Sequence, residues 1–209
     1  MIDAQFFEET HQYLINGMLT PSTTQLMHLM PEFSSLYSGV SKAVLNKKAQ
    51  YGDRVHELVE SVGKGMPVPD DFAWSSYEGL ALKRFLQLQE EHDITIESSE
   101  QIVAYIEDEI PLVAGKYDLL GNVEEKPSLI DIKTTSKYNQ TYLEIQLSTY
   151  KICLEQMGTP VEKLYCLYLP KKGLGRLIEV NPLPNEVALR KLHEACERQR
   201  QIFDNPTCA

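Results

Sequence analysis

The chain has 209 residues, of which 43% are hydrophobic and 24% are charged. This composition excludes a disordered chain, a collagen-like fibre and a disulfide-stapled miniprotein, and the length suits one domain over residues 1–209. Twenty basic and thirty acidic residues give a net charge of −10, which disfavours binding to anionic membranes and non-specific binding to nucleic acid. No apolar run approaches the ~20 residues of a membrane span, and the first nine residues lack the features of a secretory signal. We therefore expect a cytoplasmic protein with no membrane partner.

The amino-terminal residues predict a β-hairpin followed by a short helix. Asn16-Gly17 lies between two short β-prone runs, 11–15 and 18–20, and this dipeptide favours a type I′ turn. Pro21 ends the second run, and Ser22 or Thr23 can then cap a helix over residues 24–30.

Two longer helices follow. Apolar residues recur with helical spacing from about Ser41 to Gly63, although Gly52 interrupts the pattern, and again from about Ser75 to Glu91. These helices and the hairpin form an amino-terminal part, residues 1–92.

The remaining part, residues 93–209, changes to strand-like spacing. We expect strands within 94–106, at 112–120 and at 128–134, with a polar turn over 121–127. A helix over 139–157, a hairpin of strands 164–169 and 174–180, and a last helix over 185–203 complete the order. This succession predicts an α/β fold, in which helices flank a central mixed β-sheet that carries the amino-terminal hairpin and helical extension.

Asp118, Asp131 and Lys133 are the most informative charged residues. Side chains alternate along a strand, so Asp131 and Lys133 share one face, whereas Ile130 and Ile132 face the other. The short connection makes the strand of Asp118 an antiparallel neighbour. Two close carboxylates repel one another unless a cation lies between them, and oxygen ligands suit Mg²⁺ or Mn²⁺. Lys133 can then position or deprotonate a water molecule, as in a metal-dependent phosphodiesterase.

These three residues resemble the core of the PD-(D/E)XK nuclease superfamily, and further motifs resemble its RecB-like branch. The chain has Gly-x-x-x-His-x-x-x-Glu at residues 52–60, Gly-x-x-Asp at residues 115–118 and Gln-x-x-x-Tyr at residues 146–150. The hairpin residues His11-x-Tyr13 and the Pro21-Ser22 pair are similar to phage-encoded exonucleases. The resemblance covers roughly residues 8–155, and each motif alone is weak.

The resemblance implies roles for these residues and a restriction-endonuclease-like core. Asp118, Asp131 and the main-chain carbonyl of Ile132 would bind metal, with His56 as an additional ligand and Glu100 as a further carboxylate, although Glu97 and Glu107 compete with it. Lys133 would activate water and stabilise charge on the phosphate. Gln146 and Tyr150 share a helix face and would meet the site or the DNA backbone. Glu57 and Glu60 have the pattern of solvated helix charges.

The four cysteines are widely spaced, at Cys153, Cys166, Cys196 and Cys208, and form no CxxC pair. We therefore expect free, mostly buried thiols, and neither a zinc site nor the iron–sulfur cluster that some RecB-like nucleases carry.

The resemblance also implies two Mg²⁺ or Mn²⁺ ions, DNA as substrate and a phage or prophage exonuclease acting in recombination or repair. A single-strand annealing protein and a homo-oligomer are further implied partners. Because the net charge opposes DNA binding, we expect a local basic groove, formed by Lys42, Lys47, Lys48, Arg54, Lys133, Lys137, Lys171 and Lys172. Two alternatives stay open at this stage: an inactive nuclease-fold module that binds DNA ends or a protein partner, and a hydrolase of another phosphodiester.

Overall fold

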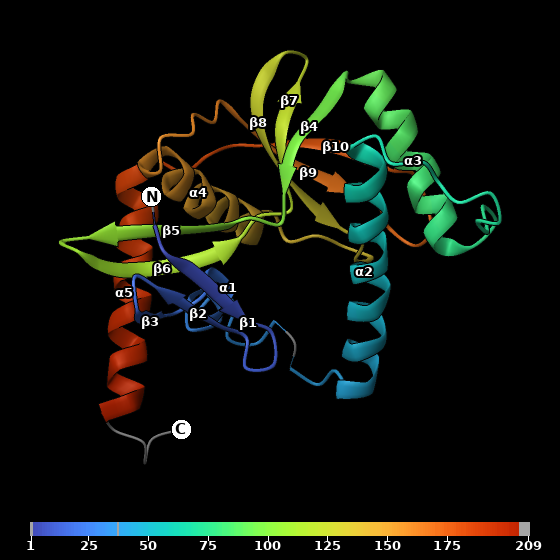
Figure 1. The fold of residues 1–209 in the computed structure, drawn as a ribbon. Coiled ribbons are helices and arrows are strands. Elements are labelled where there is room, and N and C mark those ends of the chain that lie inside the picture. The colour runs from blue at the N-terminus through green and yellow to red at the C-terminus, as the bar shows by residue number, and fades with distance from the viewer. Residues whose placement is uncertain (1, 37, 205–209) are drawn as a thin grey trace.

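A mixed five-stranded sheet lies at the centre of the computed structural model, which describes residues 2–36 and 38–204. Its strand order is β10-β9-β8-β7-β4, with β8 and β9 parallel and the other pairs antiparallel (Figure 1). The bounds are β4 Ile94–Ser99, β7 Leu119–Val123, β8 Lys126–Lys133, β9 Lys163–Tyr168 and β10 Arg176–Val180. The predicted mixed α/β fold is thus confirmed, and β8 is its central strand.

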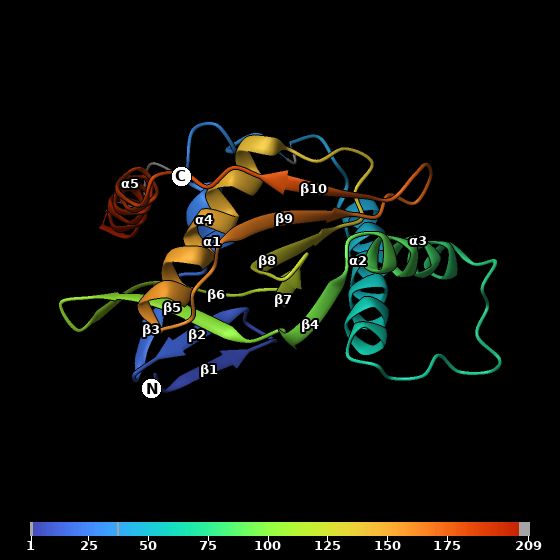
Figure 2. The same ribbon diagram turned by 90° about the horizontal axis from the view of Figure 1, so that it is seen from above.

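Helices cover both faces of this sheet (Figure 2). On one face, α4 (Gln140–Gln156) packs over β8, β9 and β10. On the other, α2 (Lys42–Gly63) and α3 (Tyr77–Glu91) share a buried core with Ile130 and Ile132 of β8. The alternation of β8 therefore turns Asp131 and Lys133 away from that core and towards the side of α4.

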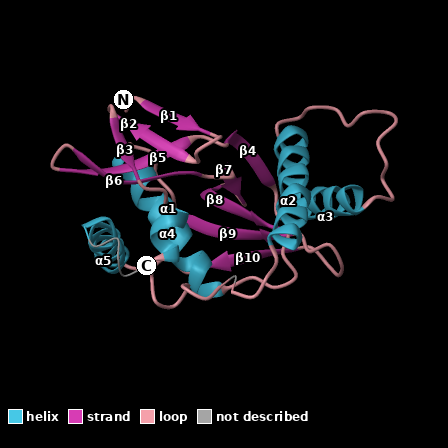
Figure 3. Cartoon of the chain, turned by 90° about the horizontal axis from the view of Figure 1, so that it is seen from below, coloured by secondary structure: helices cyan, strands magenta, loops and turns pink. Residues whose placement is uncertain are grey.

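The other elements lie around α4, on the opposite side of the molecule from α2 and α3 (Figure 3). They are β1 Ala4–Phe7, β2 Gln12–Ile15, β3 Met18–Thr20, α1 Thr23–His28, β5 Ile102–Glu107, β6 Ile110–Lys116 and α5 Asn185–Asp204. The hairpin prediction holds, because Asn16 and Gly17 take positive φ angles of 49° and 77° between β2 and β3. Ser22 caps α1 through a capping box with Gln25, and α2 runs through Gly52 without a break.

The predicted single strand over residues 112–120 is wrong, because the chain leaves the ladder at Tyr117 and Asp118 and forms β6 and β7 separately. The facing strand breaks at the same level. Ser99 pairs with Leu119 before the break and Ile102 pairs with Lys116 after it. Two residues of each segment, 100–101 and 117–118, therefore lie without ladder partners in the break, and the pairing register is the same before and after it. We call this interruption the ladder break.

The predicted turn over residues 121–127 is also wrong in extent, because the turn is only Glu124 and Glu125. Both take positive φ angles, 50° and 65°, which make a two-residue hairpin turn between β7 and β8. The strands are consequently longer than the polar composition of this segment indicates.

The structure also bears on the cysteines and on membrane-spanning helices. Cys153, Cys166 and Cys196 are buried free thiols, whereas Cys208 lies outside the described residues. Among the described helices, none is long and apolar enough to cross a membrane.

Candidate metal-dependent active site

The carboxylates of Asp118, in the ladder break just before β7, and of Asp131, in β8, are close enough for their charges to interact. Leu119 pairs with Ile130 in the β7–β8 ladder, so Asp118, one residue earlier, lies opposite Asp131. Asp118 Oδ2 accepts a hydrogen bond of 2.6 Å from the N–H of Ile132. Because the N–H and C=O of one strand residue point to the same neighbour, the Ile132 carbonyl also lies on the side of Asp118. The structure thus brings together three of the predicted metal-binding residues.

Lys133 forms an ion pair with Asp131 from the same face of β8. Its Nζ lies 2.8 Å from Oδ1 and 2.7 Å from Oδ2 of Asp131, and 3.3 Å from Gln146 Oε1 on α4. Burial disfavours the charged ammonium, but the carboxylates of Asp131 and Asp118 outweigh it and raise the pKa of Lys133. In this arrangement Lys133 is a fixed positive charge beside the two aspartates.

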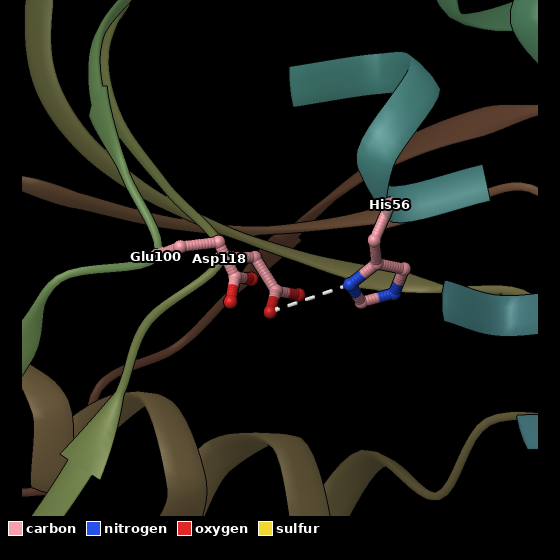
Figure 4. A group of neighbouring side chains, drawn as sticks. All are labelled: His56, Glu100 and Asp118. Carbon is pink, nitrogen blue, oxygen red and sulfur yellow. Dashed lines mark ion pairs between the residues drawn. The ribbon is translucent and has the colours of Figure 1, made fainter. Parts of the chain in front are cut away.

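His56, Glu100 and Asp118 form a second grouping around the ladder break. One potential ligand atom from each lies within 4.8 Å of the others, and His56 Nδ1 lies 3.6 Å from Asp118 Oδ1 (Figure 4). Glu100 takes a positive φ of 53°, and its N–H donates to the carbonyls of Tyr117 and Asp118. The break therefore aims both carboxylates at the imidazole. Glu97 and Glu107 lie elsewhere, bonded to Asn122 and His193.

Three residues of α2, spaced by four, each lie next to a residue at or just beyond the end of a strand. Gly52 approaches Thr134, since a Cβ built on Gly52 would lie 3.3 Å from Thr134 Oγ1. His56 then faces Asp118, and Glu60 accepts a hydrogen bond from Ser99 Oγ. The expectation that Glu60 is a solvated helix charge is wrong for this reason. The helical spacing of the Gly-x-x-x-His-x-x-x-Glu motif could have placed Glu60 on the site face.

Gln146 and Tyr150 share the face of α4 that meets the sheet, and both are buried. Gln146 reaches Lys133, whereas Tyr150 packs on Gly115, where a Cβ would lie 2.5 Å from Tyr150 Cε1. This close approach explains the glycine of the Gly-x-x-Asp motif. Burial raises the pKa of Tyr150 well above its ordinary value, so its hydroxyl stays protonated at neutral pH.

Two further residues near the site were given no role in it from the sequence. Lys116 Nζ lies 2.6 Å from Glu100 Oε2, and its spacing of two from Asp118 could have suggested a shared face. Tyr13 of β2 is buried, and burial together with the charge of Glu100 raises its pKa to about 12. The amino-terminal hairpin therefore contributes to the surroundings of Glu100, which no local sequence pattern indicates.

The donor atoms of this site fit a divalent cation. Asp131 Oδ2 is buried and accepts no hydrogen bond among the described residues, although Lys133 lies beside it as an ion-pair partner. Burial raises the pKa of Asp118 to about 6. His56 and Lys133 act to lower this pKa, and the negative charge of Asp131 acts to raise it. A cation would relieve the repulsion between these carboxylates. Carboxylate oxygens with one imidazole suit Mg²⁺ or Mn²⁺ better than a soft metal.

Comparisons with known proteins identify the family of this chain and proteins of similar fold. A crystal structure from Eubacterium rectale, described as a "putative exonuclease", is similar over 88% of this chain and 80% of that chain, with a TM-score of 0.50 and 10% identity. The crystal structure of SSO0001 is similar over 78% and 88%, with a TM-score of 0.38 and 16% identity. No curated protein matches the chain. Residues 25–208 match the family described as the PD-(D/E)XK nuclease superfamily, and the chain therefore belongs to this superfamily.

Proposed function

We propose that this protein is a divalent-metal-dependent deoxyribonuclease that degrades linear DNA as an exonuclease. The observation that carries the proposal is the meeting of Asp118, Asp131 and Lys133 at the end of the central strand. The E. rectale protein, described as a "putative exonuclease", supports it through a shared fold. A role in recombination or repair, a phage origin, an annealing-protein partner and a homo-oligomer stay predictions from the resemblance.

Asp118, Asp131, Glu100, His56 and the Ile132 carbonyl would hold one or two Mg²⁺ or Mn²⁺ ions. Bound there, the metal would supply a Lewis acid that activates water at neutral pH and offsets charge on the phosphate. Lys133 can donate a hydrogen bond to an attacking water or to a phosphate oxygen, and Gln146 holds its ammonium in place. Tyr150 keeps α4 at a fixed distance from β6 through its contact with Gly115.

Digestion of DNA tests the proposal directly. An end-labelled linear duplex and a closed circle are incubated with Mg²⁺, Mn²⁺ or EDTA, using wild type, Lys133→Ala and the control Lys126→Ala at the opposite end of β8. We expect metal-dependent loss of the linear DNA alone, abolished by Lys133→Ala and kept by Lys126→Ala. Cutting of the circle would make the protein an endonuclease. No degradation with either metal would contradict the proposal and favour the inactive, DNA-end-binding module.

A further inference from the structure

Three segments, far apart in sequence, lack acidic residues in this acidic chain. Residues 33–52, 132–143 and 164–178 contain eight basic residues and no Asp or Glu, although the chain carries 30 acidic residues in total. Acidic residues resume on α2 only at Asp53. This uneven distribution leaves the rest of the molecule more acidic than its net charge of −10 indicates.

The structure brings these three segments into contact at the carboxyl ends of β8 and β9. Gly52 approaches Thr134, and Lys171 Nζ lies 5.1 Å from the ring centre of Tyr51. Tyr168 donates a hydrogen bond of 2.8 Å to the carbonyl of Ser136. Each segment thus contacts the other two, and Lys133 of the site lies at the same end of the sheet.

Six exposed lysines, which we call the basic rim, mark this end of the molecule: Lys42, Lys47, Lys48, Lys137, Lys171 and Lys172. Among the described residues, ion pairs engage Arg54, Lys64, Lys116, Lys133, Lys151, Lys163 and Lys191, and none engages a lysine of the basic rim. Arg54, which the sequence grouped with these lysines, is instead held by Glu78 at 2.7 and 2.9 Å. In the described part of the chain, the lysines of the basic rim therefore form no ion pair with a carboxylate, although the charge of Lys171 contributes to lowering the pKa of Glu78.

The amino-terminal half of α2 carries part of the basic rim beyond the sheet. The buried residues of α2 begin at Tyr51, and residues 42–50 are exposed apart from the half-buried Leu45. In Figure 1 this lighter-blue half of the helix extends away from the sheet. These nine residues extend the helix by about 13 Å beyond Tyr51.

An exposed aromatic ring lies beside one lysine of the basic rim. Tyr77 is 45% exposed, and Lys171 Nζ lies 4.2 Å from its ring centre. Surfaces that bind single-stranded nucleic acid combine a basic path for the phosphates with aromatic rings for the bases. We propose that the basic rim and Tyr77 bind a single DNA strand next to the site. This inference rests on the proposed function and adds the surface and the form of DNA.

Binding without metal tests the surface separately from catalysis. The anisotropy of a labelled single-stranded oligonucleotide is measured in EDTA over a range of salt concentrations, with a duplex of the same sequence as competitor. The variants are Lys47→Ala/Lys48→Ala, Lys171→Ala/Lys172→Ala and the control Lys126→Ala, an exposed lysine at the other end of β8. Each lost lysine–phosphate contact makes the negative slope of log K against log salt less steep by about 0.7 for single strands. We expect each double variant to make it less steep by up to about 1.4, and the control to leave it unchanged.

Several results would overturn the proposal. They are double variants with the wild-type slope, a control that loses as much as they do, and a duplex that competes as well as the single strand. If wild type degrades DNA while both double variants bind normally, the surface is wrong and the proposed function survives. If wild type neither binds nor degrades DNA, both fall.

Discussion

The candidate site holds its carboxylates in two different ways. Asp131 lies inside the central strand, where its side chain is 5% exposed and the parallel ladder with β9 continues before and after it, although the ladder with β7 ends at Ile130. Glu100 and Asp118 lie in the ladder break, where their side chains are 33% and 16% exposed. Backbone pairing with β9 holds Asp131 in place, whereas Glu100 and Asp118 leave the ladder and point towards His56. We therefore expect substitutions in the strand to affect catalysis and folding together, and substitutions in the break to affect mainly metal affinity.

The strand side of this comparison predicts the largest effect. We expect Asp131→Asn to lower the rate of DNA degradation by about 10³-fold or more, because it removes a carboxylate from the charge-stabilising site. It should also cost about 2 kcal/mol of unfolding free energy, since Lys133 loses its partner, and less than a fully buried pair because Lys133 is 23% exposed. Digestion assays and urea unfolding measure the two effects. The control is Asp108→Asn in the β5–β6 turn, and activity above about a tenth of wild type would contradict the expectation.

The break side predicts a smaller effect of another kind. We expect His56→Ala and Glu100→Gln each to raise the metal concentration for half-maximal activity by about 10- to 100-fold, with little change in unfolding. A Mg²⁺ or Mn²⁺ titration of DNA degradation measures this shift. His193→Ala, which removes a histidine paired with Glu107, serves as the control. A half-saturating concentration that stays at the wild-type value in both variants would show that the break does not hold metal.

The contact between Gly115 of β6 and Tyr150 of α4 predicts an effect on stability. Gly115→Ala forces a Cβ to within 2.5 Å of Tyr150 Cε1, and such overpacking costs about 1–3 kcal/mol. Gly52→Ala is the matched control, because its nearest atom would be Thr134 Oγ1 at 3.3 Å and alanine favours a helix interior by up to about 1 kcal/mol. Urea unfolding compares the two. Equal stability of the two variants would refute the close approach of α4 to β6.

The smallest effect concerns Glu60, which connects α2 to the end of β4. Burial acts to raise its pKa, but hydrogen bonds from Ser99 and Lys64 outweigh burial and lower it. A lowered pKa means that ionised Glu60 stabilises the fold above about pH 4.5 and that this stabilisation is lost as the pH falls further. We expect Glu60→Gln to cost about 0.5–1 kcal/mol at pH 7 and almost nothing near pH 3. Chemical unfolding at both values checks this, with exposed Glu57→Gln as control; a pH-independent difference would contradict it.

Local chemistry made much of the fold predictable. Asn16-Gly17 sets its hairpin through positive φ angles, and Ser22, Ser41 and Asn139 cap helices close to the expected positions. The spacing of Asp131 and Lys133 was enough to place both on one face of a central strand. In each case the signal lies within a few residues of the feature that it predicts.

The ladder break could not be predicted in the same way. Residues 112–120 have the composition of one continuous strand, and their interruption depends on Glu100 and Gln101 in the facing strand. The pairs Lys116–Glu100 and Arg54–Glu78 likewise join residues that are distant in sequence. Such partners are decided by strand register and helix packing, which the order of residues shows only indirectly.

The ladder break contains the same number of residues on each side, and this limits where the chain tolerates insertions and deletions. Removing one residue from either side of the ladder break would shift one strand by a single position. Every side chain of β4 or β5 would then turn to the opposite face: buried Ile94 would move to the exposed face of Thr95, and Val103 would leave its core cluster for the side of the amino-terminal hairpin. Length variation among relatives should therefore concentrate in the turns at Asp108-Glu109 and Glu124-Glu125, where an added residue changes no pairing.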